Sequence, residues 1–127
     1  MTAQALLRGR RVLVVEDDYF LASDAARALE GAGAAVLGPC PSEQAALGEL
    51  ARARPDAVLL DINLGDGASF RLAEALRDEL IPFAFVTGYD RATIPARFAD
   101  VGHVIKPVQL NDIVDAVAKL LRAEARG

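Results

Sequence analysis

The stretch Val12-Leu13-Val14-Val15-Glu16-Asp17-Asp18 decides the fold, because four consecutive apolar residues end there on three acids. An apolar run without polar alternation is typical of a strand covered on both faces, as in a parallel sheet. In open parallel sheets the functional crevice lies beyond the carboxyl ends of the strands. The stretch therefore predicts a buried strand with a polar site at its end.

The rest of the chain alternates between two patterns of apolar residues. Short continuous runs, rich in β-branched or aromatic residues, predict further strands at residues 35–37, 57–60, 83–86 and 101–105. Apolar residues at helical spacing predict helices over residues 21–32, 42–54, 72–80 and 110–121. This alternation predicts an α/β fold, a doubly wound five-stranded parallel sheet with right-handed crossovers and helices on both faces.

The segment between the last two predicted strands is too short for a full helix. It runs from Gly88 to Gly102 and contains Pro95, a residue that favours the first turn of a helix. We therefore expect a short or disordered fourth helix. No repeat, linker or low-complexity tract interrupts the chain, so residues 1–127 are expected to form a single domain with its core at about residues 11–121.

Composition excludes several classes of protein. The 127 residues are 53% apolar and 25% charged, which is too apolar for intrinsic disorder, and no apolar stretch reaches the ~18 residues of a membrane span. The net charge of −4 gives no basic face for nucleic acid. The single cysteine, Cys40, excludes an internal disulfide and suits a reducing compartment. With no secretory signal in the sequence, we expect a cytoplasmic domain that binds neither nucleic acid nor membrane directly.

Four of the predicted strands carry polar residues at their carboxyl ends. These are Glu16, Asp17 and Asp18 after the first strand, Asp61 after the third, Thr87 on the fourth and Lys106 after the fifth. Carboxylates ~4 Å apart repel one another, so they take up protons or bind a divalent cation. A few hard oxygen ligands with room for water suit Mg²⁺. With Lys106 as a second cation and Thr87 as a donor, the set predicts attack of Asp61 on phosphorus to give an acyl phosphate.

Each of these residues alone has an ordinary structural explanation. Acids before a helix often cap it and match its dipole. An Asp after a strand, a Thr-Gly pair and a Lys-Pro pair all occur in turns and at surfaces. Their combination in this order, each at its own strand end, favours chemistry over coincidence.

The same motifs resemble the receiver domain of two-component response regulators over roughly residues 11–121. They are Val12–Asp18, Val58–Asp61, Thr87 and Lys106-Pro107. The resemblance implies the flavodoxin-like strand order 2-1-3-4-5. It also implies Asp61 as the phosphoacceptor, Thr87 as the switch hydroxyl, and Lys106 as the partner of Asp61 and of the phosphate. Glu16 and Asp17 would form the acidic pair, and Asp18, which falls outside this pair, is expected to cap the first helix.

The resemblance further implies the cofactor and the partners. Mg²⁺ would be held by Asp17, Asp61 and the main-chain carbonyl of Asn63, with Glu16 acting through a water. The phosphoryl group would come from a histidine kinase or a histidine phosphotransfer protein. The domain would then alter its binding to a downstream protein effector, or act as a phosphate shuttle or sink. It would not be an enzyme beyond its own phosphorylation and dephosphorylation.

Three other functions fit the sequence less well. A phosphohydrolase of the dehalogenase type would need a second acid two residues after Asp61, where Asn63 stands. A flavodoxin-like cofactor binder would need Ser, Thr and Gly after the first strand, where carboxylates stand. A receiver-like scaffold that has lost phosphorylation is disfavoured by the intact Asp61, Thr87 and Lys106.

The sequence departs from the receiver pattern in two places. The loop after the phosphoacceptor reads Asn63-Leu64-Gly65-Asp66-Gly67 without the usual proline, so we expect this loop to be freer. His103 takes the place of the usual Tyr or Phe switch residue. It is expected to be a partly exposed residue of an edge strand, with a substitute rotamer switch and a phosphoacceptor as the alternatives.

Residues 82–90 carry a narrower similarity. They are similar to stand-alone receivers of α-proteobacteria with a Phe-x-Thr-Gly signature, which are often paired with histidine kinases of the HWE type. In such proteins Gly88 would leave the phosphorylation site open to a partner, and Tyr89 would overhang it.

Overall fold

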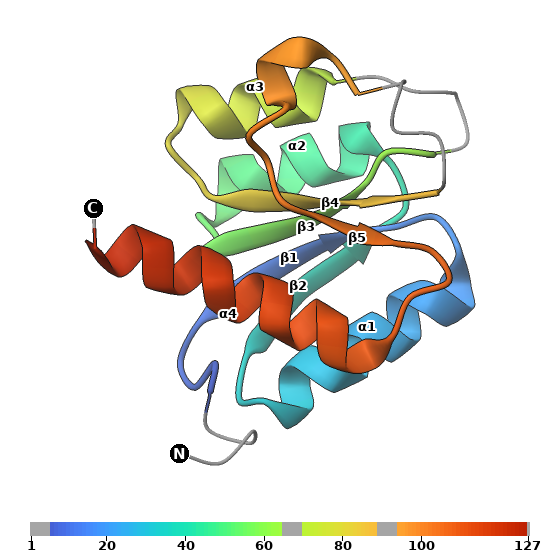
Figure 1. The fold of residues 1–127 in the computed structure, drawn as a ribbon, viewed down its shortest axis with the longest axis vertical. Coiled ribbons are helices and arrows are strands. Elements are labelled where there is room, and N and C mark those ends of the chain that lie inside the picture. Colours follow the sequence, from blue (N-terminus) through green and yellow to red (C-terminus); the bar gives the residue numbers. More distant parts are fainter. Residues whose placement is uncertain (1–5, 65–69, 89–93, 127) are drawn as a thin grey trace.

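The computed structural model describes residues 6–64, 70–88 and 94–126, with residues 123–126 described by their backbone only. Within these residues the chain forms a five-stranded parallel sheet of order β2-β1-β3-β4-β5 (Figure 1). The strands are β1 (Arg11–Val15), β2 (Ala35–Cys40), β3 (Ala57–Asp61), β4 (Phe83–Thr87) and β5 (His103–Ile105). The predicted fold class and strand order are confirmed.

Helices cover both faces of this sheet. In the described residues they are α1 (Tyr19–Gly31), α2 (Glu43–Arg52), α3 (Arg71–Asp78), the 3₁₀ helix η3 (Ala96–Phe98) and α4 (Leu110–Arg126). α1 and α4 pack side by side on one face, and α2 and α3 lie on the other (Figure 1). The central strands are therefore buried on both faces, which explains why their sequences show no polar alternation.

The residues of each central strand divide between two apolar cores. In β1, Val12 and Val14 belong to the core under α1 and α4, whereas Leu13 and Val15 belong to the core under α2 and α3. All four side chains are buried. Because successive strand residues point to opposite faces, the whole run must be apolar, and polar residues are accommodated only where the strand ends.

Two helix starts follow the expected capping chemistry. At the start of α1 the Asp18 side chain accepts the backbone N–H groups of Phe20 and Leu21 at 3.0 and 3.1 Å. At the start of α2 the Ser42 hydroxyl accepts the Ala45 N–H at 3.1 Å. Such side chains satisfy amides that have no partner in the first turn of a helix. Asp18 is therefore a capping residue, as its position outside the acidic pair predicts.

The third helix is shorter than its apolar stripe predicts. α3 ends at Asp78, and the chain turns at Leu80, which has a φ of +59° and an exposed side chain. The Ile81 N–H donates to the Leu76 carbonyl at 2.9 Å and so satisfies one carbonyl of the last turn. The prediction that this helix reaches Leu80 is wrong because the closing turn needs that residue.

A short fourth helix is confirmed in the described part of its segment. η3 is a single turn that follows Pro95, and its Phe98 is buried. The guanidinium carbons of Arg77 and Arg97 lie 5.0 and 4.9 Å from the centre of the Phe98 ring. The Arg77 side chain also donates to both Asp100 carboxylate oxygens, at 3.0 and 3.2 Å. A buried aromatic ring and two arginines therefore hold a segment that has too little helix to pack by itself.

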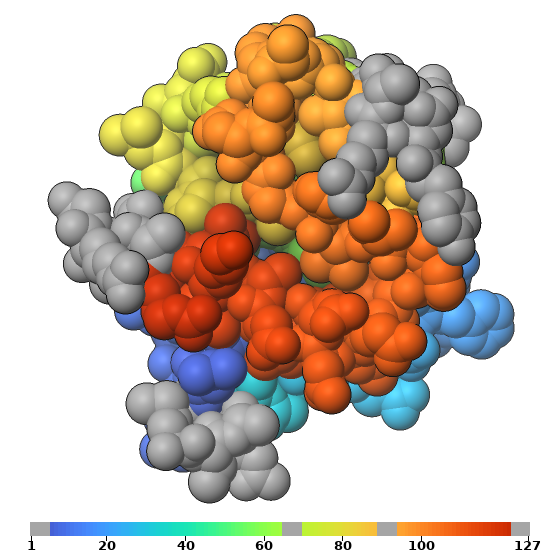
Figure 2. Space-filling model, viewed as in Figure 1, coloured from blue at the N-terminus to red at the C-terminus, as the bar shows by residue number. Residues whose placement is uncertain are grey.

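A groove of about 630 Å³ lies between β5, the residues just before it and α4, and Figure 2 shows it as the hollow between the orange and red parts of the chain. Its lining includes Ala84, Asp100, His103, Val104, Ala116 and Leu120.

The expectations for Gly65–Gly67 and for Tyr89 fall on residues outside the described part of the chain. Within the part that is described, no helix combines the length and the apolar character needed to cross a bilayer.

Candidate functional site

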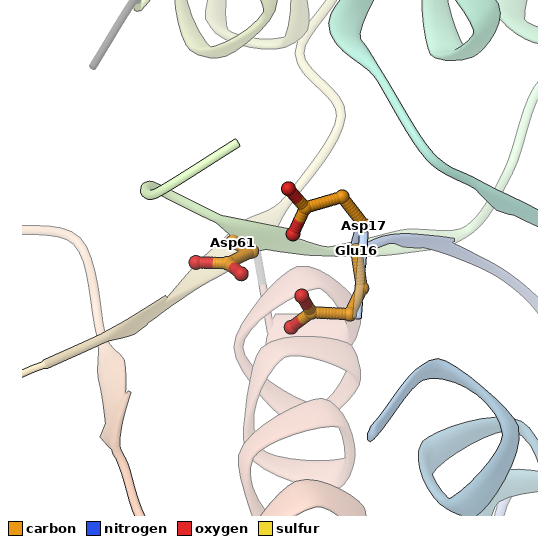
Figure 3. A group of neighbouring side chains, drawn as sticks. All are labelled: Glu16, Asp17 and Asp61. Carbon is orange, nitrogen blue, oxygen red and sulfur yellow. The ribbon is translucent and has the colours of Figure 1, made fainter. Parts of the chain in front are cut away.

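Three acidic side chains meet at the carboxyl ends of β1 and β3. Glu16 and Asp17 follow β1 directly, and Asp61 is the last residue of the neighbouring strand β3. Figure 3 shows the Glu16 and Asp17 carboxylates extending from the end of β1 toward the side on which Asp61 lies, and one oxygen of each residue lies within 4.8 Å of the others. Glu16 and Asp61 are buried and Asp17 is exposed, so the cluster reaches solvent on the side of Asp17.

Lys106 brings a positive charge to this cluster from the other side. It follows β5 directly, and its Nζ donates to Asp61 Oδ2 at 2.9 Å. The Asp61 side chain is fully buried, while 30% of the Lys106 side chain is exposed. Burial lowers the pKa of Lys106, but the ion pair with Asp61 and the nearby carboxylates outweigh burial and raise that pKa above its ordinary value. The ammonium is therefore charged at neutral pH.

Thr87 ends β4, the strand between β3 and β5. Its side chain is buried, and its hydroxyl donates to the Gly88 carbonyl at 3.3 Å. The Thr87 carbonyl accepts the Lys106 N–H at 2.7 Å, and the Ile62 N–H donates to the Val86 carbonyl at 3.1 Å. The strands are thus still hydrogen-bonded at the residues that carry the site, and the sheet itself sets the position of the backbone at Thr87 and Lys106.

The crowding of the carboxylates raises the pKa of Glu16. Burial, together with the hydrogen bond and the charge of Asp61, raises the pKa of Glu16 to about 8. The Asp18 N–H, which donates to Glu16 Oε2 at 3.1 Å, and the Lys106 charge oppose this shift. Glu16 therefore holds a proton more readily than an ordinary carboxyl group, and a cation bound in the cluster would oppose this shift. This is the behaviour that the sequence predicts for carboxylates in this arrangement.

The donor set fits a hard divalent cation. Carboxylate oxygens in small number, with one side open to water, suit Mg²⁺ better than a closed cage or a thiolate site. The Asn63 N–H donates to Asp61 Oδ1 at 2.9 Å, so one oxygen of Asp61 is oriented by an amide and the other by Lys106. Glu16 and Asp17 offer carboxylate oxygens from the end of β1, and Asp61 offers one from the end of β3, all within 4.8 Å of one another.

The structure brings together most of the residues that the sequence singles out. Asn63 lies beside Asp61 and is exposed, and the metal-binding role of its carbonyl stays a prediction. His103 is a half-buried residue of β5, the edge strand, opposite Phe85 of β4, which confirms the structural expectation for it. A Cβ at Gly88 would lie 3.9 Å from Asn63 Nδ2, so a side chain at this position would contact a residue beside the site.

Two contacts that support the site are missed by the sequence analysis. The Cys40 carbonyl at the end of β2 accepts the Glu16 N–H at 2.9 Å. Glu43 of α2 accepts the Leu72 N–H at 3.0 Å and so caps the helix that follows the Asp61 loop. The run Gly38-Pro39-Cys40-Pro41 indicates an irregular end of β2, but no sequence signal connects Glu43 to α3.

Comparison with known proteins identifies the family. The family model described as the response regulator receiver domain matches residues 12–118. The sensory transduction protein LytT of Bacillus cereus is 33% identical over 113 residues, which cover 86% of this chain and 46% of that protein. The solution structure of SdrG from Sphingomonas melonis Fr1 is 31% identical, with a TM-score of 0.70 and coverage of 95% of this chain and 99% of that one. The response regulator PhyR from Brucella abortus is 25% identical, with a TM-score of 0.81 and coverage of 96% and 52%.

The chain therefore belongs to the family of response regulator receiver domains, the signalling modules of two-component systems. Receiver domains bind Mg²⁺ at an acidic pocket, and Glu16, Asp17 and Asp61 form an acidic cluster of this kind. The chain spans about half the length of the curated relatives it matches.

Proposed function

We propose that this protein is a phosphorylatable switch whose phosphoacceptor is Asp61. The position of this carboxylate carries the proposal, because it is fully buried, lies 2.9 Å from the Lys106 ammonium and has two further acids within 4.8 Å. A carboxylate held in one orientation by a cation and an amide is a nucleophile with a defined direction of attack. Attack on phosphorus would join an Asp61 oxygen to the phosphoryl group and break the bond between that group and its donor.

Mg²⁺ would be held by Asp17, Asp61 and the main-chain carbonyl of Asn63, with Glu16 acting through a water. The oxygen donor set and the raised pKa of Glu16 support this assignment, because a cation would relieve the crowding of the carboxylates. When bound, the ion would neutralise charge on the phosphoryl oxygens. Lys106 would supply the second positive charge, from the opposite side of the Asp61 carboxylate.

Thr87 would report the modification to the rest of the fold. Its hydroxyl now makes a long hydrogen bond of 3.3 Å to the Gly88 carbonyl, and a phosphoryl oxygen would be a stronger acceptor. The Thr87 carbonyl is bonded to the Lys106 N–H, so a shift of Thr87 would reach the end of β5 and the loop before α4. Phosphorylation would alter protein binding only as far as it stabilises one conformation over the other. The output would be altered affinity for a protein effector, or phosphate transfer as a shuttle or sink.

The phosphoryl donor would be a histidine kinase or a histidine phosphotransfer protein in the cytoplasm. The run Phe85-Val86-Thr87-Gly88 supports an HWE-type kinase as the source, because it carries the Phe-x-Thr-Gly signature of the receivers that such kinases often serve. Gly88 supports access for such a partner, since a side chain there would project toward Asn63 beside the site.

Phosphorylation by a small donor tests the proposal. After incubation with acetyl phosphate and Mg²⁺, intact-mass spectrometry should show one added phosphate on the wild type and on Asp112→Asn, in which an exposed acid of α4 is changed. Asp61→Asn should show none. A phosphorylated Asp61→Asn would contradict the assignment of the phosphoacceptor. Continuous release of phosphate from a generic phosphoester would support a hydrolase instead.

A further inference from the structure

The end of β2 carries a bulge that reaches the acidic cluster. β1 and β2 pair in parallel with Leu13 opposite Leu37 and then Val15 opposite Cys40, so β2 holds one extra residue between these pairs. Bulges are frequent next to active sites, where they re-aim a side chain or end the pairing of strands. Beyond this bulge the Cys40 carbonyl accepts the Glu16 N–H at 2.9 Å. The hydrogen bonding of β2 therefore extends to the first residue of the cluster.

Gly38 makes this bulge possible. Its φ is +84°, which residues with a Cβ rarely adopt. A Cβ at this position would also lie 2.7 Å from the Cys40 nitrogen and 3.2 Å from the Val14 carbonyl oxygen. Both atoms belong to the backbone, so no rotation of a side chain can relieve the contact. Any side chain at position 38 therefore displaces Cys40 or separates the ends of β1 and β2.

We infer that Gly38 is a positioning residue for Glu16 and acts through the Cys40 carbonyl. The inference rests on the proposed Mg²⁺ site and deepens it. Glu16 is buried, and it is held at its N–H by Cys40 and at its carboxylate by the Asp18 N–H at 3.1 Å. Because its backbone and its carboxylate are both fixed, a displacement of Cys40 moves the carboxylate relative to Asp61.

The surroundings of the turn favour this role over a purely structural one. Pro39 and Pro41 flank Cys40, and their rings restrict φ on both sides of the residue that supplies the carbonyl. Both prolines line a hollow of about 310 Å³ together with Glu16 and Asp17. The turn is thus a conformationally restricted segment that lies beside two of the acidic residues. Outer contacts that orient metal ligands commonly change metal affinity 10- to 100-fold when they are lost.

The test is Mg²⁺ binding to the whole chain by isothermal titration calorimetry. Gly38→Ala should raise the Mg²⁺ dissociation constant at least about tenfold. Gly48→Ala in α2 is the matched control, because a Cβ there meets nothing within 4 Å, and its affinity should stay at the wild-type value. Cys40→Ala removes the buried thiol but keeps the carbonyl, so it should bind Mg²⁺ like the wild type even though it loses packing.

Hydrogen exchange gives a second measurement that a general loss of stability would not reproduce. In Gly38→Ala the Glu16 amide should exchange faster, while the Leu59 amide in the centre of the sheet keeps its wild-type rate. Wild-type Mg²⁺ affinity in a folded Gly38→Ala protein would overturn the inference. Equal losses of affinity in Gly38→Ala and Cys40→Ala would also overturn it, because destabilisation would then explain both.

Two further experiments test the inference if Gly38→Ala does not fold. Gly38→Asn places the same Cβ at the bulge, but Asn tolerates a positive φ better, and it should show the same loss of Mg²⁺ affinity. In the wild type, saturating Mg²⁺ should shift the carbonyl-carbon resonance of Cys40, and a shift no larger than that of Ala35 at the start of β2 would overturn the inference. A wild type that binds no Mg²⁺ at all would overturn the proposed metal site.

Discussion

Replacement of Lys106 by methionine removes the ammonium beside Asp61 and keeps the apolar stem of the side chain. At the observed 2.9 Å, two opposite unit charges attract by about 6 kcal/mol at an effective dielectric constant of 20. Loss of water from both groups offsets much of this attraction, and 30% of the Lys106 side chain still faces solvent. Hydrogen bonds to charged groups contribute ~1.5–3 kcal/mol net. We therefore expect Lys106→Met to lower the free energy of unfolding by ~2–3 kcal/mol.

Urea unfolding followed by circular dichroism measures this loss with and without Mg²⁺. A bound cation would replace the missing charge beside Asp61, so we expect the loss to fall below about 1 kcal/mol in saturating Mg²⁺. By linkage, each ~1.4 kcal/mol recovered in this way requires tenfold tighter Mg²⁺ binding by the variant. Lys119→Met is the control, because it changes an exposed lysine of α4 and should alter stability by less than ~0.5 kcal/mol.

Three results would refute this reasoning about Lys106. The first is a loss no larger than that of Lys119→Met, which would mean that the buried Asp61 carboxylate does not depend on its partner. The second is the same loss at every Mg²⁺ concentration, which would separate the ion pair from the cation site. The third is weaker Mg²⁺ binding by Lys106→Met, since a neighbouring ammonium repels a bound cation and its removal cannot weaken the site electrostatically.

The other predictions concern the residues around the site and the anchor of η3. Glu16→Gln should flatten the pH dependence of stability between 4.5 and about 8 in Mg²⁺-free buffer. A raised pKa stabilises the fold at pH values below the pKa of the unfolded chain, and this stabilisation is lost as the pH rises to the pKa of the folded chain. If urea unfolding of Glu16→Gln shows the same pH dependence as the wild type, the assignment is contradicted. Asp18→Ala should cost about 1 kcal/mol through loss of the α1 cap, measured against Asp24→Ala within the same helix. Phe98→Ala should cost ~3–5 kcal/mol in the same assay, and a cost under ~1 kcal/mol would mean that the ring does not anchor η3.

The sheet could be predicted because burial on both faces restricts the residues of its central strands to apolar types. β1 and β3 are covered by helices on both faces, so their apolar runs are continuous and end abruptly at Glu16 and Asp61. The side chains of the site could be predicted for the same reason, since parallel strands bring their carboxyl ends to one edge of the sheet. The capping role of Asp18 also follows from local chemistry, because a helix start depends on residues next to it.

Features that depend on contacts distant in sequence could not be predicted. The stripe that ends with Leu80 reads as one helix, yet α3 ends at Asp78, and Ile81 after it packs in the core with Leu60 of β3 and Phe85 of β4. The anchoring of η3 depends on Arg77 of α3, which contributes to the Phe98 ring from another element. Nothing in the local pattern around Phe98 distinguishes a ring held by arginines from an ordinary core residue.

The bulge of β2 shows why side chains of a site are easier to predict than the backbone that supports them. A side chain is named by its letter, but a carbonyl acceptor depends on register, and a shift of one residue changes which group faces which. Gly38 directly follows the strand predicted at residues 35–37, and a regular ladder would place Pro39, not Cys40, opposite Val15. Pro39 and Cys40 both carry carbonyls, so composition alone does not distinguish the two registers. The extra residue brings the Cys40 carbonyl to the Glu16 N–H, and the geometry of the acidic cluster therefore depends on a glycine that carries no functional group.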